Sequence, residues 1–152
     1  MKSKRSANPN RFFSKQEKEL ILKSIREAET ATSGEIRLHL ERKTKKDVYQ
    51  RALTVFHKIG MNKTAQRNGV LIYLATGDHK FVILGDEGIN QVVPDNFWED
   101  AVAEIVSYFK KEEFCEGVCR GIEKIGEKLK TYFPYQSDDI NELPDEISIG
   151  EK

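Results

Sequence analysis

Acidic and amide side chains gather in residues 84–90, just after an expected strand. Asp86, Glu87 and Asn90 supply the hard oxygen ligands that calcium and magnesium prefer, and two glycines in the segment allow a sharp turn of the backbone. Three more acids stand at the start of the next expected helix and would close the site: Asp95, Glu99 and Asp100. These residue types predict a divalent-metal site beyond one end of a sheet.

Electrostatic repulsion is the reason for expecting a cation in this loop. Two carboxylates ~4 Å apart repel each other by ~4 kcal/mol at an effective dielectric constant of about 20. Residues 81–109 contain no Lys, Arg or His, so no basic side chain close in sequence relieves that repulsion. A divalent ion between the carboxylates would turn repulsion into attraction.

Each acid also has an ordinary structural role open to it. Asp95 suits the N-cap of a helix, the two acids after it suit the positive end of a helix dipole, and Asp86 with Glu87 suits a solvated turn. The loop does not follow the EF-hand pattern, because Gly88 would fall where a ligand is required. It also lacks the Gly-Lys-Ser/Thr ending of a phosphate-binding loop. The sequence therefore leaves open both a metal site and simple surface acids.

No second cluster has the spacing of a catalytic or zinc site. His39, His57 and His79 are scattered along the chain. Cys115 and Cys119 stand four residues apart in a helical pattern, where a disulfide is geometrically awkward, so we expect two reduced and partly buried thiols. No catalytic residue is assigned.

Length and composition indicate one domain. The chain has 152 residues, of which 38% are hydrophobic and 33% charged, and its formal net charge is zero. The longest apolar run, residues 70–75, is far shorter than the ~20 residues of a membrane span, and no apolar signal-peptide stretch follows the basic N-terminus. We expect a cytoplasmic protein without direct membrane insertion. The basic stretch 42–46 has no interleaved aromatic residues, which favours a solvated loop over nucleic-acid contact.

Hydrophobic periodicity predicts the order helix, strand, helix, strand, strand, helix, helix. Helices are expected from Ser14, near Asp47, around Asp95 and from about Phe114. Strands are expected over residues 35–42, 70–75 and 80–84, with a short fourth strand near 91–93; the alternation in 35–42 indicates one wet face.

This order predicts an α/β protein with a three-layer α/β/α sandwich and a small mixed sheet of about four strands. We expect a flexible lead over residues 1–10, the domain over 11–133 and an acidic tail over 134–152.

Segments in this order resemble the TPM-domain family, and most closely its small stand-alone bacterial members. They are residues 32–39, 64–75 and 83–90, with Phe97-Trp98, Phe109 and Glu116-Gly117. The resemblance implies a sheet of about four strands between helices and one or two calcium or magnesium ions where loops cross beyond the sheet. That role would fall on the 85–90 loop and on Asp95, Glu99 and Asp100.

The resemblance leaves the activity open. Plant thylakoid relatives are proposed acid phosphatases, and many exported relatives have Asp before the Asn-Gly that precedes the second strand. Here that residue is Arg67, which counts against a phosphatase.

Three functions follow from these patterns. The first is a metal-binding interaction module, in which binding orders the loops that a protein partner recognises. The second is a metal-assisted phosphatase acting on phosphomonoesters, although no nucleophile, histidine acid or phosphate-binding arginine is evident near the acids. The third is an adaptor whose acids only solvate its surface.

Overall fold

The fold is a four-stranded mixed sheet between helices. The computed structural model describes residues 5–44, 47–136 and 146–150. Its elements are α1 (Pro9–Phe12), α2 (Lys15–Glu29), β1 (Glu35–Glu41), α3 (Val48–Lys58), β2 (Gly69–Ala75), β3 (Lys80–Gly85), α4 (Glu87–Asn90), α5 (Glu99–Phe109), α6 (Phe114–Tyr132) and β4 (Ser148–Ile149). The strand order is β3-β2-β1-β4, with β1 parallel to β2 and to β4, and β2 antiparallel to β3.

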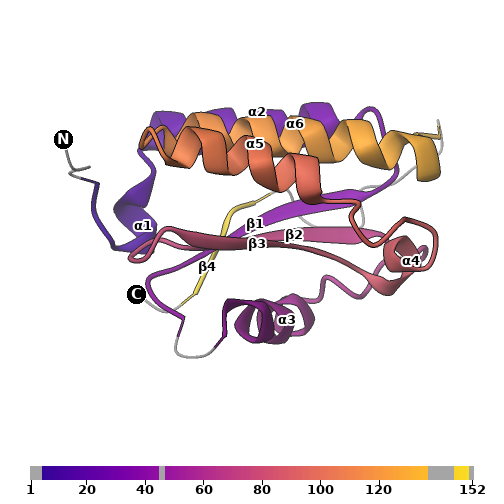
Figure 1. Cartoon of the computed structure of the whole chain (residues 1–152), viewed down its shortest axis with the longest axis horizontal. Coiled ribbons are helices and arrows are strands. Elements are labelled where there is room, and N and C mark those ends of the chain that lie inside the picture. The colour runs from indigo at the N-terminus through magenta and orange to yellow at the C-terminus, as the bar shows by residue number, and fades with distance from the viewer. Residues whose placement is uncertain (1–4, 45–46, 137–145, 151–152) are drawn as a thin grey trace.

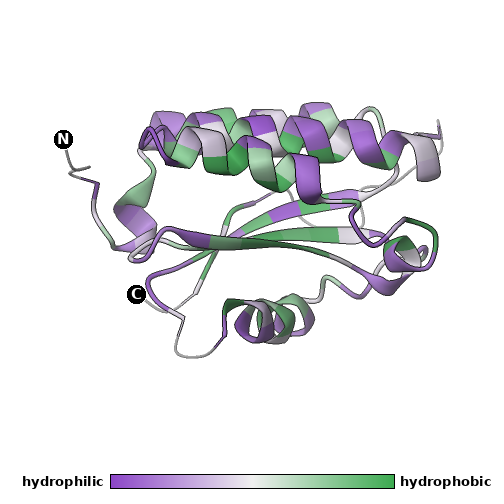
Figure 2. Ribbon diagram, in the orientation of Figure 1, coloured by the Kyte–Doolittle hydropathy of each residue, from purple (hydrophilic) through white to green (hydrophobic). Residues whose placement is uncertain are grey.

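Helices cover both faces of this sheet, as Figure 1 shows. The α2, α5 and α6 helices pack on one face over a large apolar core, and α3 packs on the other face over a smaller one. Hydrophobic residues line the inner sides of these helices in Figure 2. The expected α/β/α sandwich is confirmed.

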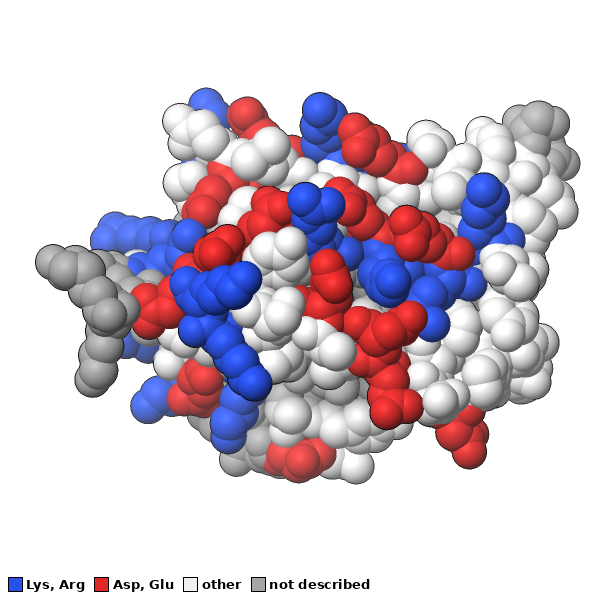
Figure 3. Space-filling model, turned by 45° about the horizontal axis from the view of Figure 1, so that its top comes forward, with Lys and Arg blue, Asp and Glu red and all other residues white. Residues whose placement is uncertain are grey.

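Charges that are separated along the sequence are mixed on the folded surface. In Figure 3, basic and acidic side chains are interspersed over the face that carries α5 and α6. No helix of the described residues is long and apolar enough to cross a membrane.

Local sequence signals placed most element starts correctly. Ser14 caps α2 through the expected capping box: its hydroxyl accepts a hydrogen bond from Glu17 N (3.1 Å), and the Glu17 carboxylate accepts one from Ser14 N (3.0 Å). Asp47 caps α3, and α6 begins at Phe114. These signals succeed because a cap involves only residues within one helical turn.

Two expected elements differ in the structure. The strand expected near 91–93 is wrong, because these residues form the turn after α4. The third helix begins at Glu99 and not at Asp95, because the intervening residues form turns closed by Phe97 N to Pro94 O (3.1 Å) and Glu99 N to Asn96 O (3.1 Å).

The fourth strand comes from the segment expected to be an acidic tail. In β4, Ser148 pairs with His39 and Ile149 with Leu40. Gly150 N donates to Leu40 O (2.8 Å). A Cβ atom at Gly150 would collide with the carboxylate of Glu41, so glycine is required for this close approach.

The face of β1 that was expected to be wet is buried. All seven of its residues are buried, including Arg37, His39 and Glu41. These polar side chains have protein partners in place of water: His39 Nδ1 lies 2.8 Å from Ser148 Oγ, and Arg37 donates to Glu146 (2.8 Å).

Glu41 is the centre of this buried network. Its carboxylate accepts hydrogen bonds from Arg51 Nε and Nη2 (2.9 and 2.6 Å) and from Tyr73 Oη (2.7 Å), and His39 Nε2 lies 3.2 Å from it. Burial alone would raise the pKa of Glu41, but the hydrogen bonds from His39, Arg51 and Tyr73 outweigh burial and lower it to about 2. The network therefore joins β1 to β2 and α3 through an ionised carboxylate.

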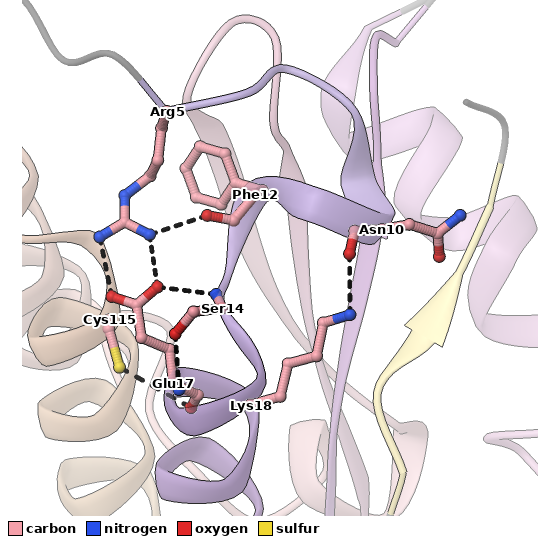
Figure 4. A network of polar contacts seen from close by, with 7 residues as sticks. All are labelled: Arg5, Asn10, Phe12, Ser14, Glu17, Lys18 and Cys115. Carbon is pink, nitrogen blue, oxygen red and sulfur yellow. Dashed lines mark hydrogen bonds and ion pairs between the residues drawn. The ribbon is translucent and has the colours of Figure 1, made fainter.

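The N-terminal residues expected as part of a flexible lead are packed from Arg5 onward. Figure 4 shows Arg5 paired with both oxygens of Glu17 (2.6 and 2.8 Å) while it donates to Phe12 O (2.7 Å). Lys18 Nζ donates to Asn10 O (2.8 Å), which holds α1 against α2. The hydrogen bond from Arg5 lowers the pKa of Glu17.

The two cysteines are free and half-buried, as expected. Cys115 Sγ lies 3.8 Å from Glu17 O, at the contact between α6 and α2 that Figure 4 shows.

We predict that the Glu41 network makes stability depend on acid. The pKa of Glu41 in the folded chain is about 2, below its ordinary value of 4.5. The contribution of Glu41 to the free energy of unfolding is therefore complete above pH 4.5 and is lost as the pH falls through about 2. Glu41→Gln should remove this dependence and lower the free energy of unfolding at pH 7 by about 2–3 kcal/mol, since Arg51, Tyr73 and His39 lose a charged hydrogen-bond acceptor. Urea unfolding at several pH values measures both, with the exposed Glu123→Gln as control. Equal stability of Glu41→Gln and the unmodified chain at pH 7 would contradict this account.

Candidate functional site

The loop after β3 holds a nearly buried carboxylate. Asp86 follows the last residue of β3 and is the N-cap of α4, where its Oδ1 accepts a hydrogen bond from Glu87 N (2.8 Å). The Asp86 side chain is only 5% exposed. A carboxylate this deeply buried is costly unless a cation or several donors pair with it.

Arg67 is the cation at this site. It directly precedes Asn68, and β2 begins one residue later, at Gly69. Its Nε and Nη2 donate to the two oxygens of Asp86 (2.7 and 2.9 Å), and its Nη1 donates to Glu87 (3.0 Å). The hydrogen bond to Asp86 raises the pKa of Arg67. One guanidinium therefore bridges both carboxylates, and it relieves the repulsion that predicted a metal.

The backbone fixes Arg67 in this position. Arg67 has a φ of +52°, in the left-handed region, and its N–H donates to Thr64 O (3.2 Å). Its carbonyl accepts a hydrogen bond from Gly88 N (2.9 Å). A Cβ atom at Gly88 would lie 2.6 Å from Arg67 O and closer still to Gln66 O. Gly88 is thus required for α4 to approach the turn that carries Arg67.

The predicted ligands fall into two separate places. Asp86, Glu87 and Asn90 lie together around Arg67, and Asn90 Nδ2 donates to Gly85 O (3.1 Å). Asp100 and Glu99 line a different hollow with Lys128, Pro94 and Phe97, among other residues. Asp95 is exposed in the turn before α5.

Lys128 is the partner of Asp100. Its Nζ lies 3.0 Å from Asp100 Oδ1, and this contact lowers the pKa of Asp100. In the described part of the chain, no three His, Cys, Asp or Glu side chains are grouped so that they could hold a metal ion. The sequence suggested that all six residues could share one site, but the structure brings only the first three together.

A cavity of about 270 Å³ opens beside the Asp86 loop. It is lined by Tyr49 and Leu53 of α3, by Trp98 and by residues 83–85 of β3, together with the residues around Arg67. Sequence reasoning missed these α3 residues and the role of Arg67. The available signal for Arg67 was its place directly before Asn68-Gly69, at the entry to β2.

The chain belongs to the TPM-domain family, because the family model described as "TPM domain" matches residues 7–128. It is also similar to a solved bacterial protein: the NMR structure of BA42 protein from the psychrophilic bacterium Bizionia argentinensis has a TM-score of 0.89 with this chain. The two are 48% identical over 95% of this chain and 100% of the other. A search of curated proteins finds no match to the sequence.

We predict that Arg67 stabilises the fold by pairing with Asp86. Arg67→Ala should lower the midpoint of thermal unfolding, because the buried carboxylate is left without its cation. Arg120→Ala is the matched control, since Arg120 pairs with Glu116 at the exposed surface of α6, where such pairs contribute little. Calorimetry compares the two variants. Equal midpoints would show that solvent replaces Arg67 at no cost.

Proposed function

We propose that this TPM domain is a divalent-cation-binding interaction module whose cation site is the Asp86 loop. The observation that carries the proposal is that one cationic group already bridges Asp86 and Glu87. In this proposal calcium or magnesium takes the place of the Arg67 guanidinium, and Arg67 turns out to solvent. The Arg67 side chain is 36% exposed, so an ion reaches it from solvent without unfolding the loop.

The oxygen ligands present fit a divalent ion that keeps much of its water. Asp86 and Glu87 would hold it through carboxylates, and Asn90 through its amide oxygen, which the hydrogen bond to Gly85 O leaves unused. So few protein ligands, together with competition from Arg67, make the site weak. Affinity in the millimolar range is expected, on the order of 10⁻³ M.

The cation site and the neighbouring cavity share residues, which connects binding to recognition. Arg67, Asp86 and Glu87 all line the cavity, and together they carry net negative charge. With Arg67 turned out to solvent, an added divalent ion would neutralise the charge of Asp86 and Glu87 at that end of the cavity. A charged partner at this surface would therefore sense the ion, which is the physical basis for a metal-responsive module.

Titration of the chelator-treated chain with calcium or magnesium, followed by amide NMR shifts, tests the proposal. We expect saturable shifts centred on residues 85–90 and a tighter site in Arg67→Ala, by roughly tenfold, because the competing charge is gone. Asp86→Asn should abolish the shifts. Asp100→Asn is the matched control, since Asp100 pairs with Lys128 elsewhere, and it should leave them unchanged. An absence of saturable shifts in the unmodified chain and in Arg67→Ala would refute the cation site.

A metal-assisted phosphatase is the second candidate. The specific observation in its favour is that an arginine does lie against the acids, which sequence reasoning had found lacking. Arg67 and His57 line the same cavity, so a phosphoryl group there would meet a guanidinium and an imidazole. Each would bind or orient the ester, and a bound cation would activate water.

Turnover of p-nitrophenyl phosphate with and without magnesium tests this second candidate. If the cavity is the active site, Asp86→Ala should lower kcat/KM by at least about 100-fold, as expected when a group central to the chemistry is removed. Turnover that persists in Asp86→Ala would show that the activity comes from elsewhere.

A further inference from the structure

The outer edge of β3 carries backbone groups that point away from the sheet. Asp86 N donates to Gly69 O (2.9 Å), and Leu84 lies opposite Leu71 in the antiparallel register. Because hydrogen-bonded pairs alternate along such a ladder, the N–H and C=O groups of Phe81, Ile83 and Gly85 face the edge opposite β2. Asn90 Nδ2 bonds Gly85 O. Across the described residues, no hydrogen bond engages the outward groups of Phe81 and Ile83.

The cavity beside the Asp86 loop lies along this same edge. Ile83 and Leu84 both line it, although their side chains belong to opposite faces of the sheet, so the cavity spans the edge of β3. Its lining is mixed: Tyr49 and Leu53 of α3 and Trp98 supply apolar surface, beside the charged side chains around Asp86. Tyr49 is 48% exposed, so its ring is accessible to a bound partner.

One end of this groove is acidic. Asp86 and Glu87 together outweigh the single charge of Arg67, and the Glu87 side chain is 62% exposed. A basic side chain that reaches this end gains an ion pair with Glu87 without having to displace Arg67. The groove therefore combines a strand edge, an apolar recess and a negative end.

We propose that the edge of β3 binds an extended peptide segment of a protein partner by β-strand addition. The peptide carries a large apolar side chain that fills the recess and, two residues along, a Lys or Arg that faces Asp86 and Glu87. Alternate residues of an extended chain face the same side about 7 Å apart, so two such side chains can enter one cavity. Backbone hydrogen bonds to Phe81 and Ile83 hold the peptide, and the recess and the acids select its sequence.

The shape of the groove favours a peptide over a second copy of the chain. Residues of α3 and Trp98 line the cavity along this edge, so an incoming strand must enter beside them. A second copy would bring its own α3 and Trp98 to the same place. This inference rests on the interaction part of the proposed function, and peptide binding does not require the cation.

A random heptapeptide display library, selected on the full chain in the presence of a chelator, tests the proposal. Enriched peptides are then synthesised with blocked ends and measured by fluorescence anisotropy and amide NMR shifts. We expect an apolar residue followed two positions later by a basic one, with shifts centred on residues 81–87. N-methylation of the peptide amides that would bond the β3 edge should abolish binding, because those hydrogen bonds supply the affinity.

Matched variants of the chain separate the groove from the rest of the surface. Tyr49→Ala should weaken binding by roughly tenfold, whereas Tyr135→Ala, at a tyrosine 49% exposed and outside the groove, should not. Glu87→Lys should weaken it by a similar factor, and the exposed control Glu123→Lys should not. Both pairs keep residue type and exposure matched.

The outcomes that overturn the inference are distinct from those that overturn the cation site. The peptide inference is overturned if no peptide is enriched or if the N-methylated peptide binds equally well. It is also overturned if the NMR shifts fall outside residues 81–87. A dimer in sedimentation whose β3 amides are also protected from hydrogen exchange would overturn the inference too, because a second copy of the chain would then be the occupant. If peptides bind in chelator but calcium and magnesium cause no amide NMR shifts, only the cation site is refuted. If the cations cause saturable shifts but no peptide binds, only the peptide site is refuted.

Discussion

A carboxylate that is taken out of water must be given a positive or hydrogen-bonding partner, and two carboxylates of this fold show how that requirement is met. Glu41 and Asp86 are almost fully buried, and each is held by an arginine from another element. Arg51 ties α3 to β1, and Arg67 ties the entry of β2 to the exit of β3. These two pairs orient the helix and the loop that together shape the candidate site.

These pairs explain why basic and acidic residues are separated along the sequence. Basic residues fill 42–67 and acids fill 81–109, which suggests an acidic loop with nothing to neutralise it. In the fold the two segments meet, and Arg67 of the first neutralises Asp86 of the second. Lys128 of α6 does the same for Asp100. A metal ion at the Asp86 loop must therefore compete with Arg67, which already neutralises Asp86. For this reason the proposed cation site is weak.

Sequence reasoning succeeded where structure is decided locally. The cap at Ser14, the apolar run of β2 and the tight β2–β3 hairpin depend on neighbouring residues, and all three were predicted. It also placed Asp86, Glu87 and Asn90 together beyond β3. It did not find β4 or the burial of the polar face of β1, because both depend on contacts between residues more than 100 positions apart. Asp100 was grouped wrongly because its partner Lys128 lies on a different helix, α6, which no short-range pattern reveals.

The distance in sequence between β1 and β4 has a consequence for synthesis on the ribosome. Residues 35–41 leave the exit tunnel long before Ser148 and Ile149 are even translated, so the nascent domain has three strands and an open flank. During that interval Glu41 and His39 lack the cover of Gly150 and Ser148. Unpaired strand edges promote association between neighbouring chains. The emergence of residues 148–150 thus completes the sheet, well after its other three strands have been made.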